Sequence, residues 1–210
     1  MAKYKTEFLL SAFAREHWPP HKGRGEIAFV GRSNVGKSSC LNTLVGGSSV
    51  ARVSKTPGRT QSINFFQVPR RGEQIVFADL PGYGYAKVPR SVTDKWDRMV
   101  GDYLIGRESL VLVVVLVDLR RDPTALDRKM IDWLNEAGRP GLLVLTKADK
   151  ISKSKRLHRR SLVCKGLGVP MEASMLFSSL QKIGREELWA RIDEAVRGLP
   201  EEDDQGAEAT

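Results

Sequence analysis

The sequence lacks an apolar run long enough to cross a membrane. Its longest run, residues 110–117, has the length of a strand, whereas a membrane-spanning helix needs about 20 apolar residues. The first five residues do not resemble the apolar segment of a signal peptide. The two cysteines, Cys40 and Cys164, lack metal-ligand spacing and favour reduced thiols. These absences argue against a membrane-inserted or disulfide-bonded class and predict a cytoplasmic protein.

Acidic residues are fewer than basic ones over the whole chain, 25 against 34, and their distribution is uneven. The net charge is +9, yet residues 201–210 carry five acidic residues and no basic one. Without those five negative charges the remainder of the chain carries +14. A strongly basic body favours a polyanionic partner, most often nucleic acid, although a generic basic surface has the same composition.

The absence of internal repeats and a length of 210 residues predict one domain. Residues 27–30, 75–78, 111–117 and 142–145 are near-continuous apolar runs, as in parallel strands that are buried on both faces. Amphipathic stretches lie between these runs. The alternation predicts a three-layer α/β domain that binds ligands beyond the carboxyl ends of its strands.

Helix signals delimit two of the amphipathic stretches. Asp122 and Pro123 are residue types of a helix start, Gly138 is a helix end, and a second apolar stripe at residues 188–196 stops before Gly198. An apolar stripe at residues 8–13 predicts a short helix near the N-terminus. The expected organisation is an arm of residues 1–24, a main domain of residues 25–198, and an acidic, disordered tail of residues 199–210.

Residues 31–38 read Gly-Arg-Ser-Asn-Val-Gly-Lys-Ser and match the phosphate-binding loop, or P-loop, G-x-x-x-x-G-K-[ST]. They follow one expected strand and precede a helical run at residues 37–44. The glycines let backbone amides turn toward phosphates, and the helix adds its positive N-terminal end. Lys37 is expected to reach the β- and γ-phosphates and Ser38 to ligate Mg²⁺. A chance glycine-rich turn is the alternative.

A second motif, the D-x-x-G turn at residues 79–82, ends another expected strand. Asp79 is suited to hold Mg²⁺ through water, because this ion keeps several of its waters. The amide of Gly82 is expected to meet a γ-phosphate, which would make the turn sensitive to hydrolysis. Upstream, Thr60 is expected to join Mg²⁺ when the γ-phosphate is present, with Thr56 as the rival ligand.

The base-recognition loop, residues 146–149, reads Thr-Lys-Ala-Asp and closes a third expected strand. Asp149 can accept hydrogen bonds from N1 and the exocyclic amine of guanine, which adenine cannot offer, so such a site discriminates against adenine. The stem of Lys147 can lie over the base. Helix capping is the alternative role for Asp149. In a weaker motif, residues 177–179, the amide of Ser179 is expected to donate to guanine O6.

These motifs together predict a P-loop GTPase that uses Mg²⁺. Lys37 and Thr60 are the expected catalytic groups, and Ser38 and Thr60 are the expected direct ligands of Mg²⁺, with Asp79 acting through water. The residues expected to contact GTP are Gly31, Arg32, Ser33, Asn34, Val35, Gly36, Lys37, Ser38, Gly58, Arg59, Thr60, Gln61, Ser62, Asp79, Leu80, Pro81, Gly82, Thr146, Lys147, Ala148, Asp149, Phe177, Ser178 and Ser179.

With these motifs the sequence resembles the bacterial EngB (YihA/YsxC) family of ribosome-biogenesis GTPases, in the TrmE-Era-EngA-EngB-septin-like group. The resemblance covers roughly residues 6–198 and rests on residues 26–39, 56–61, 63–66, 79–86 and 146–149. Cys40, where an aliphatic residue is usual, and the acidic tail are departures. The resemblance implies a Ras-like fold, with a mostly parallel six-stranded sheet flanked by helices on both faces.

The resemblance also implies GTP hydrolysis, assembly of the large ribosomal subunit, and a link to normal growth and septation. The implied partner is the large subunit or its precursors, and we expect a monomer without membrane insertion. The alternative from another class is a GTP-regulated scaffold for division or for the membrane surface. An ATP-using enzyme is a further alternative, which Asp149 disfavours.

The usual residue for orienting the attacking water is missing. Ras-like enzymes place a glutamine directly after the D-x-x-G turn, and this sequence has Tyr83 there. Slow hydrolysis, accelerated by a partner, is therefore expected. Asn34 is either a ligand for K⁺, which in related GTPases substitutes for an arginine finger, or a residue that stabilises the loop. The sequence leaves both roles open.

Two acid-free regions are candidates for an RNA-binding face, with a merely solvated surface as the alternative. Reversing the charges of Lys155, Arg156, Arg159 and Arg160 is expected to weaken subunit binding and to spare GTP affinity. The first region, an expected helix, contains Lys150, Lys153, Lys155, Arg156, Arg159, Arg160 and Lys165, and the second contains Arg52, Lys55, Arg59, Arg70 and Arg71.

Overall fold

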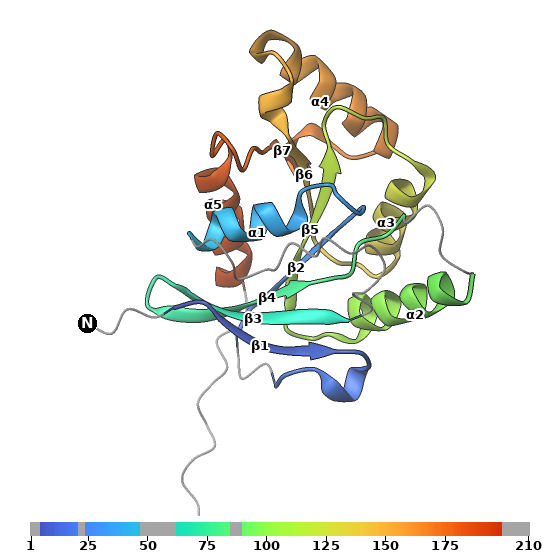
Figure 1. Cartoon of the computed structure of the whole chain (residues 1–210), viewed down its shortest axis with the longest axis vertical. Helices are drawn as coiled ribbons and strands as arrows, with labels where there is room; N and C mark the ends of the chain where they lie inside the picture. The colour runs from blue at the N-terminus through green and yellow to red at the C-terminus, as the bar shows by residue number, and fades with distance from the viewer. Residues whose placement is uncertain (1–4, 21–23, 47–61, 85–89, 199–210) are drawn as a thin grey trace, which may run out of the picture.

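The computed structural model describes residues 5–20, 24–46, 62–84 and 90–198 (Figure 1). They form a seven-stranded sheet with the order β1-β3-β4-β2-β5-β6-β7. The strands are β1 (Glu7–Ala12), β2 (Glu26–Gly31), β3 (Ile63–Arg70), β4 (Glu73–Asp79), β5 (Leu110–Asp118), β6 (Gly141–Thr146) and β7 (Ser174–Leu176). The α-helices are α1 (Lys37–Val45), α2 (Arg90–Gly106), α3 (Ala125–Glu136), α4 (Lys153–Leu167) and α5 (Arg185–Arg197).

The sheet is mostly parallel. The pairs β4–β2, β2–β5, β5–β6 and β6–β7 are parallel, and only β1–β3 and β3–β4 are antiparallel. Every residue of β2 is buried, as is every residue but one of β5, because helices cover the sheet from both sides. The expected α/β class is confirmed.

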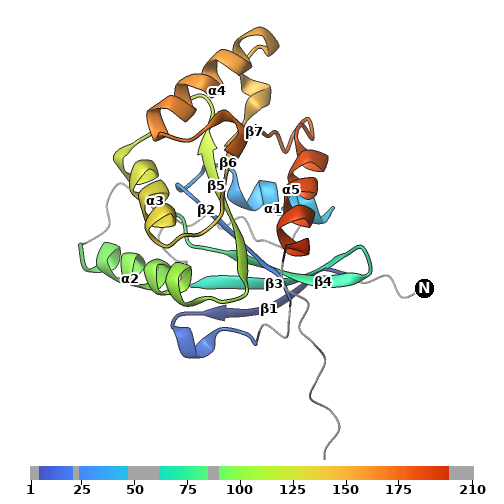
Figure 2. The same cartoon turned by 180° about the vertical axis from the view of Figure 1, so that it is seen from behind.

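The helices divide into two layers (Figures 1 and 2). Leu44 of α1 and Ile192 of α5 are buried in one apolar cluster with Phe29 of the sheet. Tyr103 of α2 and Leu134 of α3 are buried in the other cluster, which α4 also joins. None of the helices in the described part of the chain combines the length and the apolar character needed to cross a bilayer.

The N-terminal arm forms a strand, and the expectation of a short helix at residues 8–13 is wrong. Strand β1 pairs with β3, where Phe8 meets Phe66 edge to face at 5.6 Å. A helix this short is marginal in water, whereas pairing with β3 satisfies the backbone of the segment. This added edge strand makes the sheet one strand larger than the six that were expected.

Helix α3 begins later than its sequence signal indicated. Asp122 and Pro123 precede the helix, and Thr124 is the N-cap residue. The Thr124 hydroxyl accepts from the amide of Asp127, whose carboxylate in turn accepts from the Thr124 amide at 2.8 Å. This reciprocal capping box satisfies two amides that a cap at Asp122 would leave without partners, which explains the shift.

A buried charge network holds the C-terminal end of α2 against β2. Glu26 is fully buried and accepts hydrogen bonds from Arg107 Nε and Nη2, the shortest at 2.6 Å, and from the Tyr103 hydroxyl. Arg139 completes this anchor, because its guanidinium donates to the carbonyls of Leu104, Ile105 and Leu110. The last turn of α2 is thus fixed by side chains from elsewhere in the fold.

A second ion pair joins the β3–β4 hairpin to α5. The Arg70 guanidinium makes two hydrogen bonds of 2.7 Å with the Asp193 carboxylate and lies over the Trp189 ring at 4.2 Å. Arg71 contacts the same carboxylate at 3.0 Å. Arg70 and Arg71 therefore have structural partners, which removes Arg70 from a freely accessible RNA-binding region.

Candidate nucleotide-binding site

The P-loop follows β2 and turns into α1 as its sequence predicts. A Cβ at Gly31 would lie 2.6 Å from the Leu116 carbonyl, so only glycine fits where the loop leaves the sheet. Asn34 and Gly36 adopt positive φ angles of 62° and 110°, which curl the loop before α1. The N-cap residue of α1 is Gly36, which has no side chain to bond the first amides of the helix, so these amides are suited to an anion.

The D-x-x-G turn is hydrogen-bonded to the P-loop. The Ser33 amide donates to the Tyr83 carbonyl at 3.0 Å, and the Tyr83 amide donates to the Gly31 carbonyl at 3.3 Å. A Cβ at Gly82 would lie 3.2 Å from the Ser33 amide nitrogen, so a side chain there would push the two loops apart. The two segments expected to meet phosphate therefore lie side by side.

Lys37 and Asp79 form an ion pair across this contact. Lys37 is the first residue of α1, Asp79 is the last of β4, and Ser38 follows in the first turn of the helix. A hydroxyl and a carboxylate are oxygen donors of the kind that Mg²⁺ prefers. The described part of the expected metal site thus fits this ion. The remaining expected ligand, Thr60, lies outside the described residues.

Further expected contact residues also lie outside the described part of the chain. They are Gly58, Arg59 and Gln61, as well as the rival ligand Thr56 and the basic residues Arg52 and Lys55. Ser62 is described and is only 5% exposed. The expectations for that loop therefore stay predictions.

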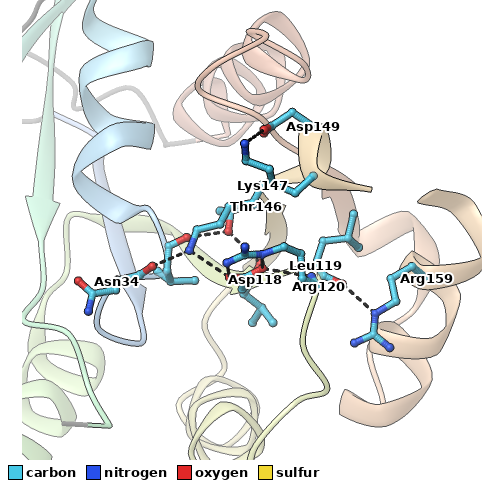
Figure 3. Close-up of polar contacts among 11 residues, drawn as sticks. Asn34, Asp118, Leu119, Arg120, Thr146, Lys147, Asp149 and Arg159 are labelled. Carbon is cyan, nitrogen blue, oxygen red and sulfur yellow. Dashed lines mark hydrogen bonds and ion pairs between the residues drawn. The ribbon is translucent and has the colours of Figure 1, made fainter. Parts of the chain in front are cut away.

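The base-recognition loop lies against the P-loop (Figure 3). The Thr146 hydroxyl lies 2.7 Å from the Val35 carbonyl, to which it can donate. Lys147 adopts a positive φ of 59°, and its ammonium donates to the Asn34 carbonyl at 2.8 Å. A lysine in this backbone conformation is uncommon and needs support from its surroundings. These two contacts fix the loop relative to the phosphate-binding backbone.

The loop after β7 positions Asp149. The Ser178 hydroxyl donates to Asp149 Oδ1 at 2.6 Å, and the Ala148 amide donates to the Phe177 carbonyl at 3.1 Å. The hydrogen bond from Ser178, together with nearby Lys150, holds the pKa of Asp149 below its usual range. The carboxylate is therefore ionised near neutral pH, as an acceptor of two hydrogen bonds from guanine must be. This role of the Ser178 side chain was not apparent from the sequence.

Asp118 is a second member of the site that sequence reasoning missed. It is the last residue of β5, which lies between β2 and β6 in the sheet. Its carboxylate is bonded to Lys147 and to Arg120 (Figure 3). The signal was present, because an acidic residue directly follows an apolar run, as at Asp79.

The hydroxyl of Tyr83 is bonded to helix α3 and not to the P-loop. The phenol donates to Asp127 of α3 at 2.9 Å, and the ring meets Trp96 of α2 edge to face. Burial and the Asp127 carboxylate raise the pKa of Tyr83 far above its ordinary value, so the phenol stays protonated. This agrees with the expectation that Tyr83 cannot replace a water-orienting glutamine.

The expected basic helix is present as α4, but its arginines serve the fold. Arg156 donates to the Ile151 carbonyl, Arg159 to Leu119 and Asp122, and Arg160 to Met171 and Ser174. The expectation that reversing Lys155 together with these arginines spares GTP affinity is therefore not sound, since the change would disturb packing. The exposed cations of this region are Lys150, Lys153, Lys155 and Lys165.

Comparisons with known proteins agree with this geometry. Residues 26–147 match the family model described as 50S ribosome-binding GTPase. A probable GTP-binding protein EngB of Geobacter sulfurreducens is 49% identical over 188 residues, which span 90% of this chain and 89% of that protein.

Solved structures are similar as well. The crystal structure of a probable GTP-binding protein EngB has a TM-score of 0.66 at 24% identity, over 82% of this chain and 99% of that one. The structure of Era in complex with MgGDPNP and nucleotides 1506–1542 of 16S ribosomal RNA has a TM-score of 0.66 at 25% identity, over 89% of this chain and 59% of that one.

Proposed function

Because this chain belongs to the EngB family of GTP-binding proteins, we propose that it is a GTP-hydrolysing switch in the assembly of the large ribosomal subunit. The observation that carries the nucleotide assignment is the bonding of three motif loops to one another. Lys147 of the base-recognition loop donates to Asn34 of the P-loop, and Tyr83 after the D-x-x-G turn exchanges backbone hydrogen bonds with Gly31 and Ser33.

Each loop has one task in this proposal. The amides of residues 31–38 and the Lys37 ammonium bind the phosphates, and Asp149 recognises guanine. Ser38 and Thr60 would hold Mg²⁺ directly and Asp79 would hold it through water, and the bound ion would neutralise charge on the phosphates. The presence of MgGDPNP in the Era complex supports this choice of metal. The role of Asp149 in guanine recognition is tested by nucleotide titration of the Asp149→Asn variant. This variant should bind GTP more weakly and xanthosine triphosphate more tightly than the unmodified protein.

The role of K⁺ at Asn34 is a separate question. Asn34 is exposed, while its backbone carbonyl is occupied by Lys147. Its side chain therefore remains suited to a monovalent cation or to stabilising the loop. Faster hydrolysis in K⁺ than in Na⁺ buffer supports the cation role, and equal rates remove it.

The ribosomal assignment rests on the family and on charge. The matched family model is described as ribosome-binding, and the Era structure contains ribosomal RNA. Helix α4 contains no acidic residue and exposes Lys153, Lys155 and Lys165, which can neutralise RNA phosphates. A partner of this kind would place the protein in the cytoplasm and would link it to growth and septation.

Charge reversal of the exposed lysines tests this face without disturbing the arginines. A triple variant should co-sediment less with large-subunit precursors and keep its GTP affinity. It combines Lys153→Glu, Lys155→Glu and Lys165→Glu. The control combines Lys5→Glu, Lys95→Glu and Arg98→Glu, which are exposed and lie outside α4. Equal losses in both triple variants would mean that net charge, and not α4, governs binding.

Turnover measurements separate the switch from the scaffold alternative. We expect purified large-subunit precursors to accelerate GTP hydrolysis in K⁺ buffer, because Tyr83 leaves the attacking water without its usual partner. Binding to anionic liposomes without any stimulation by precursors would favour a scaffold at the membrane surface.

A further inference from the structure

The carboxylate of Asp118 lies where three loops of the nucleotide site meet. Asp118 ends β5, the strand beside β6, and its side chain is only 9% exposed. Lys147 and Asn34 approach it from two other segments of the chain (Figure 3). An acidic side chain at so enclosed a position requires partners that compensate for its lost hydration.

Both oxygens of this carboxylate have partners. Oδ1 accepts from the Arg120 amide at 3.1 Å and from Arg120 Nε at 2.9 Å. Oδ2 accepts from Arg120 Nη2 at 2.8 Å and from Lys147 Nζ at 3.0 Å. Although burial opposes ionisation, the hydrogen bonds from Arg120 and Lys147 hold the pKa of Asp118 well below its usual range. The group is therefore a permanent anion beside the Lys147 ammonium.

The Asp118 anion is one of two groups in the described part of the chain to which the Lys147 ammonium donates. This ammonium has three N–H donors, and two of them are used by Asp118 and by the Asn34 carbonyl. The ammonium is thus held at two points, while the backbone of Lys147 has a positive φ of 59°. A long, flexible side chain anchored at both ends has few rotamers left, so its aliphatic stem becomes a fixed surface.

We propose that Asp118 is a positioning residue for nucleotide binding, which holds Lys147 so that its stem forms one wall of the purine pocket. This inference rests on the proposed function, in which the Lys147 stem lies over guanine. Without the carboxylate, the Asn34 carbonyl is the one remaining partner of the ammonium among the described residues, and the stem regains rotamers that binding must then remove. Because GTP and GDP share the base, both should lose affinity by the same factor.

The competing explanation is that Asp118 only orders the turn that follows β5. Arg120 bonds the same carboxylate, and Arg159 of α4 donates to the neighbouring Leu119 carbonyl at 2.8 Å. If ordering this turn were the whole role, losing Arg120 would affect the nucleotide as much as losing the carboxylate. The two explanations therefore predict different results for Arg120→Met.

The test is a double-mutant cycle on the full-length protein. Asp118→Asn and Lys147→Met are made singly and together, and the dissociation constants of GTP, GDP and inosine triphosphate are measured for each. We expect Asp118→Asn alone to weaken all three nucleotides by about tenfold, and by less than about twofold in the Lys147→Met background. Equal factors in both backgrounds, or no loss at all, would overturn the proposal.

Two further variants keep the result interpretable. Asp122→Asn removes a charge from the same loop, at a residue that forms an ion pair with Arg159, and Arg120→Met removes the other cation on the carboxylate. Neither should change the dissociation constants by more than about twofold. A tenfold loss in Arg120→Met would assign the effect to the turn and refute the role through Lys147.

The measurements distinguish failure of the positioning role of Asp118 from failure of the proposed nucleotide site. If Lys147→Ala, which removes the stem, binds GTP like the unmodified protein, the placement of Lys147 over the base is wrong. If Lys147→Met loses affinity but Asp118→Asn does not, only the positioning role is refuted. Unfolding midpoints of all variants, measured without nucleotide, show whether any loss reflects an unfolded fraction.

Discussion

Tyr83 donates a hydrogen bond from its phenol to Asp127 Oδ1, 2.9 Å away. The residue after the D-x-x-G turn is thereby held against the first turn of α3. The other oxygen of Asp127 accepts from the amide and hydroxyl of Thr124 at 2.8 and 2.7 Å. One carboxylate therefore both caps a helix and anchors the segment that approaches the P-loop.

Replacing Tyr83 with phenylalanine should affect stability more than catalysis. Tyr83→Phe keeps the ring and its contact with Trp96 and removes one buried hydrogen bond, which should cost about 1–2 kcal/mol of unfolding free energy. Urea denaturation measures this loss. Intrinsic GTP turnover should stay within about twofold of the unmodified protein. A large fall in turnover at unchanged stability would instead place the phenol in the reaction.

Breaking the Glu26–Arg107 pair should strongly destabilise the fold. Glu26→Gln leaves the Arg107 guanidinium, only 8% exposed, without its counter-ion, and removing one partner of a buried pair costs about 3–5 kcal/mol. Chemical denaturation provides the measurement. Glu108→Gln, an equal change of charge at an exposed neighbour, is the control and should alter stability by less than about 0.5 kcal/mol. Similar losses in both variants would contradict this assignment.

The arginines and lysines of α4 should behave differently on substitution. Arg160 donates to Ser174 Oγ at 2.8 Å and to the Ser174 carbonyl at 2.7 Å, which joins α4 to β7. Arg160→Met should therefore lower the free energy of unfolding by about 1–3 kcal/mol, because it removes these part-buried hydrogen bonds. Lys155→Met, at an exposed position, should change it by less than about 0.5 kcal/mol. Thermal unfolding distinguishes the two, and equal melting temperatures would contradict the structural role.

The Asp193 carboxylate should contribute stability that depends on pH. Its hydrogen bond from Arg70, aided by the nearby Arg71 and Arg197 charges, holds its pKa below the usual value, although burial opposes this. The contribution is present above the pKa of the unfolded chain, about 3.9, and is lost as pH falls through the lower folded value. Asp193→Asn should thus be less stable at pH 7 and lose less stability between about pH 5 and pH 2.

The measurement is the unfolding free energy as a function of pH. Glu194→Gln, an exposed neighbour on α5, provides the same change in charge without the contact to Arg70. An acid-dependent slope in Asp193→Asn as steep as in the control would show that other carboxylates govern the acid transition.

The central strands were predictable because strands that are buried on both faces consist almost entirely of apolar residues. Each of the four apolar runs became β2, β4, β5 or β6. Strand β7 has only three residues and gives too short a signal. Strand β1 depends on β3, a partner far along the chain, so local periodicity favoured a helix. Helix α2 was overlooked, although Trp96, Val100 and Tyr103 show helical spacing.

The site was predictable where a motif depends on its own backbone. The P-loop turn and the D-x-x-G turn lie at the ends of β2 and β4, and each motif specifies its glycines. The partnerships of Asp118 with Lys147 and of Ser178 with Asp149 span 29 residues of sequence each. These contacts form because β5, β6 and β7 are neighbours in the sheet. The order of the strands cannot be read from any single segment of the sequence.

Helix α2 has the construction of a lever that is fixed at one end. Its C-terminal end is pinned, because Arg139 binds the Leu104 and Ile105 carbonyls and Arg107 is locked to Glu26. Toward its other end, Trp96 donates to the Pro81 carbonyl at 2.9 Å, directly on the D-x-x-G turn. A helix of 17 residues is about 25 Å long, so a small displacement of that turn would swing the near end about a stationary pivot. Such an arrangement would confine a rearrangement to the N-terminal part of α2 and leave its C-terminal end, which is bonded to Glu26 at the start of β2, in place.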